Sequence, residues 1–559
     1  MSTRSKIATL AVAVSLSFLN RPEAFAQGNL PLKHTGKPTQ TAITVDDAMT
    51  RLYIFADDSM LGRGLGEAGG IKATSYIERE LRRLGLTPAG DNGTFFQAIP
   101  LYTRTLDMTS RLLADAEALT PGTDYIPFRS GGTPRSVDGA QIIYAGNTSD
   151  PLSLIPGEAA AGKVVAITGP TPGLLRRYPA AIAFIAFRAD AGLAQARRFA
   201  LAPATEMRTS ADTARSVLTI VVPNSAAPKF LCVPLENARP GTVGRTLHGD
   251  VRYTSVDAAA RNVVAILPGS DPKLRNQYVA IGAHSDHLGL RSAGPVDTDS
   301  LRTFNEIASR IYMARTKEMP DLPGSGITAE ERASIKVNVD SLRAIRPARL
   351  DSVYNGADDD GSGSIGVLEV AEKFAGARVK PKRSLLFVWH TGEESGLFGS
   401  EFFTDHPTIA RDSIVAQLNV DMIGRGAAID LPGGNPDYLQ LLGSRRLSTE
   451  LGDLVEAVNK TTAKPFNFDY QYDAPGHPDQ YYCRSDHYEY ARYGIPIVFM
   501  STGGHVDYHQ VTDEPQRINY PHLARVTNLL ADVAERVANL DHRPVVDKPK
   551  PDPKGQCVQ

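Results

Sequence analysis

Side chains that can bind a divalent metal follow several separate apolar runs of this sequence. Glu393 and Glu394 come directly after one such run, and two adjacent buried carboxylates repel each other unless a cation or a shared proton relieves them. The other candidates are spread along the chain: His284 with Asp286, the acidic triplet 358–360, Asp421 and His509. A mixed set of imidazoles and carboxylates suits Zn²⁺ and related ions, and several anionic ligands together predict two metals bridged by one carboxylate.

The apolar runs near these residues have the length and composition of buried strands. They cover residues 278–281, 385–389, 414–420 and 495–500. Gly392 and Gly396 allow a tight turn around the two glutamates. Ligand sites of α/β proteins lie beyond the carboxyl ends of their strands, which is where the candidates stand. We therefore expect an α/β fold with a mixed central β-sheet flanked by helices.

Each feature taken alone has a plainer structural interpretation. A histidine two residues from an aspartate is most often structural, and a pair of glutamates usually begins a solvated helix. The acidic triplet would suit a turn or a Ca²⁺ loop, although it lacks the acidic spacing of an EF-hand. The occurrence of all these features after successive strands favours a functional site, because groups with perturbed pKa values cluster at such sites.

Composition argues against some classes of partner and points to export. The chain has 559 residues and a net charge of −2, so its charge does not favour a nucleic acid or an anionic membrane as partner. No internal apolar run reaches the roughly 18 residues of a membrane span, so we expect no membrane anchor. Arg4 and Lys6 precede an apolar stretch and then Ala24-Phe25-Ala26. This pattern predicts a signal peptide over residues 1–26, cleaved after Ala26, and a periplasmic or secreted protein.

The segments around the candidate site differ in composition. Residues 106–255 carry short β-type runs and no cluster of histidines and carboxylates, which predicts a separate β-rich domain inserted between 40–105 and 256–540. Residues 291–353 are predicted to form a helical insertion, and our hypothesis is that they cover or narrow the cleft at the site. Residues 541–559 are rich in proline and lysine, which predicts a disordered tail.

The three cysteines, Cys232, Cys483 and Cys557, allow at most one disulfide. An exported protein of this size with so few cysteines is not stapled by disulfides, and the sequence does not choose which pair would form. The sequence also leaves the oligomeric state open.

Five motifs occur in order along the chain. They are Gly-Ala-His-Ser-Asp-His-Leu-Gly from residue 282, Asn-Gly-Ala-Asp-Asp-Asp-Gly-Ser-Gly from 355, Gly-Glu-Glu-Ser-Gly-Leu-Phe-Gly-Ser from 392, Asn-Val-Asp-Met-Ile-Gly from 419 and Asp-Tyr-His-Gln-Val-Thr-Asp-Glu from 507. As a set they resemble the bacterial leucine-type zinc aminopeptidases, which are co-catalytic zinc exopeptidases, over most of 40–105 and 256–540. Residues 106–255 resemble, more weakly, a protease-associated domain inserted in some members of that family.

The resemblance implies a set of metal ligands. Asp359, the middle residue of the acidic triplet, would bridge two Zn²⁺ ions, although other divalent metals would also suit the set. His284 and Asp421 would complete one site, and Glu394 and His509 the other. The resemblance also implies a cis peptide bond after Asp359.

It implies further roles for residues around the metals. Glu393 would be the general base, and Asp286 would hold His284 in orientation, as carboxylates near ligand histidines commonly do. Tyr508 is placed like a residue that steadies the tetrahedral intermediate, and Arg484 like one that contacts the substrate.

These roles predict an aminopeptidase acting on peptides with a free N-terminus. The metals would lower the pKa of a bridging water, and Glu393 would take its proton as the resulting hydroxide attacks the peptide carbonyl. Two other enzymes on the same scaffold remain as alternatives, a carboxypeptidase, which needs a basic pocket, and a glutaminyl cyclase, which works with one metal. A non-catalytic binding protein would have lost ligands or the base, and none is missing here.

Overall fold

A large mixed β-sheet forms the centre of the protein. The computed structural model describes residues 30–559 apart from 129–131, 192, 209–214, 321 and 426–434, so the predicted signal peptide lies outside the described residues. The strands of the large sheet follow the order β10 (Ala204–Met207), β2 (Phe96–Leu106), β14 (Tyr253–Leu267), β18 (Ser384–His390), β15 (Tyr278–His284), β19 (Ile414–Val420), β22 (Ile497–Ser501), β20 (Tyr438–Leu442) and β21 (Asn467–Asp469), with β1 (Thr87–Pro88) paired to β14. The predicted mixed sheet is therefore confirmed.

The middle of this sheet is parallel. Strand β15 pairs in parallel with β18 on one side and β19 on the other, and β19 pairs in parallel with β22. These four strands are buried along their length apart from Tyr278, which explains their nearly continuous apolar sequences. Because they run in one direction, their carboxyl ends meet at one edge of the sheet, and the candidate motifs begin there.

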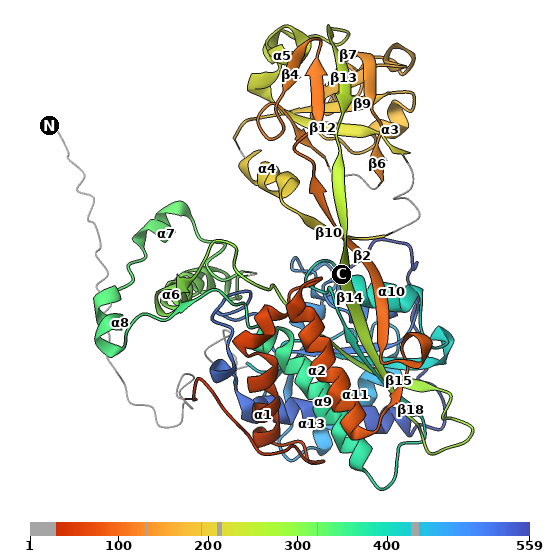
Figure 1. Ribbon diagram of the computed structural model, residues 1–559. Coiled ribbons are helices and arrows are strands. Elements are labelled where there is room, and N and C mark those ends of the chain that lie inside the picture. The colour runs from red at the N-terminus through yellow and green to blue at the C-terminus, as the bar shows by residue number, and fades with distance from the viewer. Residues whose placement is uncertain (1–29, 129–131, 192, 209–214, 321, 426–434) are drawn as a thin grey trace, which may run out of the picture.

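Helices cover both faces of the sheet. Along β18, Leu385, Phe387 and Trp389 enter one apolar cluster whereas Leu386 and Val388 enter another, as the alternation of side chains in a strand requires. The first cluster is completed by α1 (Val45–Phe55), α2 (Ala68–Leu84), α9 (Gly363–Gly376), α11 (Thr449–Thr461) and α13 (Tyr520–Ala538), which lie together in Figure 1. The second cluster is completed by α10 (Phe398–Asp405) and α12 (His487–Ala491).

A second sheet with its own apolar core lies within residues 106–255. Its strands follow the order β4 (Glu117–Leu119), β3 (Arg111–Ala114), β13 (Val243–Asp250), β7 (Val137–Asn147), β8 (Val164–Thr168), β9 (Ala183–Arg188), β12 (Leu218–Pro223) and β5 (Ile126–Pro127). Figure 1 shows this sheet above the large one, joined to it by the long strands β2 and β14.

Residues 291–353 form a helical arm. It contains α6 (Thr298–Thr316), α7 (Ala329–Ser334) and α8 (Val339–Ile345), and its two ends are tied by the short strands β16 (Val296–Asp297) and β17 (Leu350–Asp351). Figure 1 shows α7 and α8 at a distance from the large sheet. Within the described part of the chain, no helix combines the length and apolar character that crossing a membrane requires.

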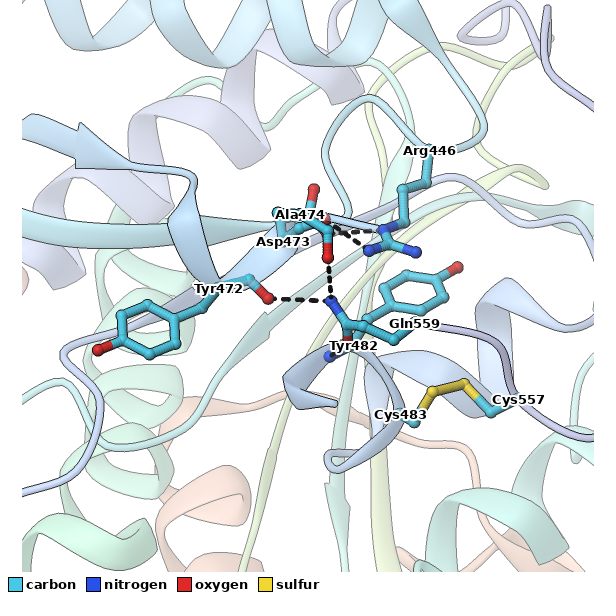
Figure 2. Close-up of a disulfide and its surroundings, with 8 residues drawn as sticks. All are labelled: Arg446, Tyr472, Asp473, Ala474, Tyr482, Cys483, Cys557 and Gln559. Atoms are coloured by element: carbon cyan, nitrogen blue, oxygen red, sulfur yellow. Dashed lines mark hydrogen bonds and ion pairs between the residues drawn. A yellow bond between two sulfur atoms is a disulfide. The ribbon is translucent and has the colours of Figure 1, made fainter. Parts of the chain in front are cut away.

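The prediction of a disordered tail over 541–559 is wrong. The Arg543 guanidinium donates to the carbonyl oxygens of Asp412 (2.7 Å) and Ile414 (3.1 Å), which fixes the start of the segment. Near its other end, Cys557 forms a disulfide with Cys483, and Cys232 is free (Figure 2). The segment is ordered by single side chains that reach neighbouring backbone groups, and such contacts leave no periodic pattern in the sequence.

Candidate functional site

Two groups of potential metal ligands share Asp359, and we call each group a half-site. The first half-site consists of His284, Asp359 and Asp421, all buried. His284 is the last residue of β15, and Asp421 directly follows the neighbouring strand β19. The Nε2 atom of His284 lies 3.2 Å from Oδ1 of Asp359 and 3.5 Å from Oδ1 of Asp421. The parallel pairing of the two strands therefore brings together ligand candidates that are far apart in the sequence.

The loop before α9 directs only one aspartate of the acidic triplet 358–360 toward the potential metal ligands. The Asp360 carboxylate accepts hydrogen bonds from the backbone amides of His284 (3.0 Å), Gly363 (2.9 Å) and Met422 (3.2 Å). Asp358 accepts from the Gly424 amide at 2.6 Å. Both flanking carboxylates are thus used by the backbone, which leaves Asp359 to face the half-site.

Two further groups hold this loop. The Asp513 carboxylate accepts from the amides of Asp358 and Asp359 at 3.0–3.1 Å. The buried Arg63 guanidinium donates to the carbonyl oxygens of Gly356 (2.8 Å) and Asp359 (3.2 Å). The Asp359–Asp360 peptide bond is cis, as the resemblance implied.

The second half-site shares Asp359 and adds Glu394 with two imidazoles, His509 and His287. The Nε2 atom of His509 lies 3.1 Å from Oδ2 of Asp359 and 2.9 Å from Oε2 of Glu394. Nδ1 of His287 is hydrogen-bonded to Oε1 of Glu394 and lies 3.7 Å from Oδ2 of Asp359. His509 is 24% exposed at its side chain, whereas His287 is fully buried.

Sequence reasoning assigned no role to His287. The residue lies only three positions after His284, inside a motif that was already noted, so the signal was present. The chain leaves β15 at His284 and turns, which brings His287 to the second half-site, and no periodic pattern in the sequence predicts such a turn. The other histidine of this region, His505, lies with Nε2 3.3 Å from Oδ2 of Asp358 and supports the acidic loop.

The unpartnered polar atoms of the site test whether it fits divalent metals. Nε2 of His284, Oδ1 of Asp421, Oδ2 of Asp359 and Nε2 of His287 are buried and have no hydrogen-bond partner among the described residues. Burying such atoms without partners is unfavourable, and carboxylates this close repel one another without a cation. The imidazole and carboxylate donors therefore fit a pair of divalent ions such as Zn²⁺.

Glu393 lies beside both half-sites. It lines a pocket together with Asp359, Asp421, Arg484 and Tyr508. Burial raises the pKa of Glu393 well above its usual range, and Asp421 and Glu394 act in the same direction against the opposing charge of His284. A carboxylate with a raised pKa is a better proton acceptor, which suits a general base.

Asp286 contacts the site differently from the sequence expectation. Its Oδ1 accepts from the backbone amide of Glu393 at 3.3 Å and lies 3.8 Å from Nδ1 of His284. The nearer partner of that imidazole nitrogen is the backbone carbonyl oxygen of Asp286, at 3.2 Å. The carboxylate therefore connects β15 to the Glu393 turn, and the backbone orients His284.

Tyr508 and Arg484 lie on the walls of the same pocket. The Tyr508 ring stacks on His509 with 3.9 Å between ring centroids. Burial raises the pKa of Tyr508 well above its usual range, so its hydroxyl stays protonated. For His509, burial lowers the pKa, but Asp359 and Glu394 outweigh it and raise that pKa to about 10.

Comparison with known proteins gives partial matches. Residues 339–534 match the model of peptidase family M28. Leupeptin-inactivating enzyme 1 of Streptomyces exfoliatus is 42% identical over 80 residues, which cover 14% of this chain and 18% of that protein. A "Probable leucine aminopeptidase" of Arthroderma otae is 32% identical over 187 residues, covering 27% of this chain and 49% of the relative. The chain thus spans about half or less of the length of these curated relatives.

Among solved structures, the aminopeptidase of Aneurinibacillus sp. strain AM-1 is similar over 91% of this chain and 97% of its own, with 16% identity and a TM-score of 0.48. At that TM-score the likeness supports no statement about function.

Proposed function

Because residues 339–534 match the model of peptidase family M28, we propose that this protein is a dinuclear zinc aminopeptidase, exported to the periplasm or the medium, that removes N-terminal residues from peptides. One observation carries the proposal. A single buried carboxylate, Asp359, lies against His284 on one side and against His509 on the other, which is the arrangement a bridging ligand needs.

The two half-sites would hold the cations. His284, Asp359 and Asp421 would bind one Zn²⁺, and Asp359, Glu394 and His509 the other. When bound, the two cations lower the pKa of a water molecule and polarise the substrate carbonyl. The protein itself must then supply a proton acceptor, a donor for the developing oxyanion and a wall that orients the peptide.

Glu393 would move the proton. Its carboxylate lines the pocket, and its raised pKa allows it to accept a proton and return it to the amine that leaves. Asp286 would position this base, because its carboxylate accepts from the Glu393 amide. The protonated hydroxyl of Tyr508, which lines the same pocket, would donate to the developing oxyanion.

The charge of the pocket favours removal of N-terminal residues. Glu393 lines the pocket and is not a proposed metal ligand, so its carboxylate can accept a hydrogen bond from an α-ammonium group and would repel an α-carboxylate. Arg484 lines the same pocket and is the observation that favours a carboxypeptidase as the second candidate. A glutaminyl cyclase is less suited, because two half-sites exceed what a one-metal enzyme needs.

The helical insertion would border the cleft from one side. Met319, just after α6, packs against Val506, and the Arg302 guanidinium donates to the buried Asp507 carboxylate with 3.0 Å between Nε and Oδ1. Val506 and Asp507 directly precede Tyr508 and His509. These contacts support the hypothesis that residues 291–353 narrow the cleft. Deletion of the arm with unchanged kinetics on short and long peptides would remove that hypothesis.

The proposed base can be tested by Glu393→Gln. We expect kcat on aminoacyl chromogenic substrates to fall by about 10²- to 10⁴-fold, because a positioned proton acceptor contributes that much. Metal analysis should still find two Zn²⁺ per chain, since Glu393 is not among the proposed ligands. Glu401→Gln, on α10 outside the pocket lining, is the matched control and should leave both measurements unchanged.

Different results would separate the candidates. Turnover retained in Glu393→Gln would exclude Glu393 as the base. Hydrolysis of N-acetylated peptides, with no hydrolysis of peptides blocked at the C-terminus, would replace the aminopeptidase by a carboxypeptidase. A single bound Zn²⁺ in the wild-type protein would favour the cyclase, and none would favour a binding protein.

A further inference from the structure

One wall of the pocket lacks long regular elements of its own. This pocket wall, residues 471–485, contains two single-turn 3₁₀ helices, Gln471–Asp473 and Tyr481–Cys483, and otherwise follows turns. Yet Tyr481, Arg484 and Ser485 all line the pocket. A wall of this kind must be held by contacts from outside itself if the side chains that face a substrate are to keep one position.

The C-terminal segment, residues 541–559, supplies such contacts. The Gln559 side chain accepts from the backbone amide of Tyr482 at 2.9 Å and donates to the carbonyl oxygens of Tyr472 (3.0 Å) and Ala474 (3.2 Å) (Figure 2). Its main-chain oxygen accepts from the Gly476 amide at 3.1 Å. One buried residue therefore bonds both ends of the pocket wall and closes it into a loop.

A covalent bond fixes the same place. The disulfide between Cys483 and Cys557 joins residues 74 positions apart and lies directly before Arg484. A further side chain holds the wall: the Arg446 guanidinium donates to Asp473 and lies 4.0 Å from the Tyr482 ring centroid (Figure 2). The wall is thus held both by Arg446, which follows β20, and by the C-terminal segment.

The C-terminal segment is itself fixed along its length. Asp547 accepts from the backbone amide (2.9 Å) and hydroxyl (2.7 Å) of Thr449 at the start of α11. Further along, the Arg492 guanidinium donates to the Pro553 carbonyl oxygen at 3.0 Å. Thr449 begins α11 and Arg492 directly follows α12, and both helices pack on the large sheet, so these contacts fix the C-terminal segment to the core of the protein.

We propose that Gln559 and Cys557 are positioning residues that set the place of Tyr481 and Arg484 in the substrate pocket. This inference rests on the proposed function, since it assigns the wall to substrate binding. Neither residue is among the pocket-lining or metal-binding groups, so they act on affinity and selectivity for the substrate through the wall. Losing them would weaken binding in the ground state and the transition state alike, which raises KM with little change in kcat.

The experiment compares Gln559→Met and Cys557→Ser with two matched controls in the full-length protein. Gln559→Met keeps the size of the side chain and removes its hydrogen bonds. Gln277→Met is its control, because Gln277 accepts from the Arg383 guanidinium before β15, away from the pocket wall. Cys232→Ser is the control for Cys557→Ser, because Cys232 is the free cysteine.

We expect each test variant to raise KM by about tenfold, which corresponds to a loss of about 1.4 kcal/mol of binding free energy. Bound Zn²⁺ and kcat should stay unchanged, and amide hydrogen exchange should increase in residues 471–485 but not in 284–290. The two controls should change neither KM nor exchange in the wall, whatever they do to the unfolding temperature.

Two outcomes would overturn the inference. Unchanged exchange in residues 471–485 would show that the wall holds its position without the C-terminal segment. Increased exchange with unchanged KM would show that the position of the wall does not matter to the substrate. If the wild-type protein hydrolysed no aminoacyl substrate, the proposed function would fail, while the exchange measurement would still decide whether Gln559 and Cys557 hold the wall.

Discussion

The two half-sites share Asp359, but different kinds of backbone structure position their other ligands. In the first, His284 ends β15 and Asp421 follows β19, so two paired strands set the positions of both ligands. In the second, Glu394 stands in the turn after β18, and His509 lies in a loop with a left-handed backbone (φ 56°). One half is therefore fixed by the sheet and the other by turns.

The half-sites also differ in their imidazoles. His284 is the one imidazole that the structure places in the first group of ligand candidates, and it faces two carboxylates. The second half-site has two imidazoles, His287 and His509, near the same two carboxylates. We infer that Zn²⁺ binding at the first half-site requires each of its ligands. At the second half-site, His287 can take the place of His509.

Asp359→Ala should have the largest effect, because it removes the one ligand that both halves share. We expect both Zn²⁺ ions to be lost on dialysis and kcat/KM to fall by at least about 1000-fold, since metal-assisted stabilisation of several kcal/mol disappears. Metal analysis and kinetics on the same sample measure this. Asp412→Ala, at an exposed position, is the control. One ion retained in Asp359→Ala would show that the halves are independent.

His284→Ala and His509→Ala compare the halves directly. We expect His284→Ala to abolish binding of one Zn²⁺, and His509→Ala only to weaken binding of the other, because His287 still faces Glu394 and Asp359. Calorimetric titration of metal-free protein with Zn²⁺ measures both affinities. Equal losses in the two variants would contradict the idea that His287 can take the place of His509.

His287→Asn should give a smaller effect. Residues that orient a metal ligand typically contribute 10- to 100-fold to metal affinity, and His287 bonds Glu394. We expect a loss in that range for one of the two ions, with the other unaffected. His406→Asn, after α10, serves as the control. No change in either affinity would leave His287 with a packing role alone.

Ser485→Ala should give the smallest loss of Zn²⁺ affinity, and it tests the first half-site. The Ser485 hydroxyl donates to Oδ2 of Asp421 at 2.8 Å. Losing one hydrogen bond costs about 1 kcal/mol, which is roughly a fivefold loss of Zn²⁺ affinity at the first half-site. Because the strands still position Asp421, a loss as large as that in His287→Asn would show that the sheet alone does not fix this ligand.

Two ligands of the site could be predicted from the buried runs themselves, whereas Asp359, Glu394 and His509, which lie in loops and turns, were assigned by the resemblance to a known family. His284 and Asp421 could be predicted to meet because each follows a buried run, and such runs form neighbouring parallel strands. The mixed sheet follows from the same runs. His287 was missed because its position depends on the turn after β15, which hydrophobic periodicity does not encode.

The C-terminal segment could not be predicted for a related reason. Its order comes from Arg543, Asp547 and Gln559, each of which contacts one or two groups elsewhere, and from a disulfide whose partners the sequence left open. Such contacts are not periodic, and a proline- and lysine-rich composition is typical of disorder. Only the three-dimensional position of their partners identifies them.

The long strands β2 and β14 have a consequence for how this protein can be rebuilt. They pair without a break from Phe96 opposite Val263 to Leu106 opposite Tyr253, and the second sheet is reached through the far end of this ribbon (Figure 1). The chain thus leaves the large sheet along β2 and returns along its antiparallel neighbour β14. The second sheet stands where a β-hairpin would have its turn. A short turn between Leu101 and Ala258, which face each other in the register, would excise that domain and keep the pairing next to β18 intact. This register predicts that the second sheet can be removed or replaced as one unit without a change in the large sheet.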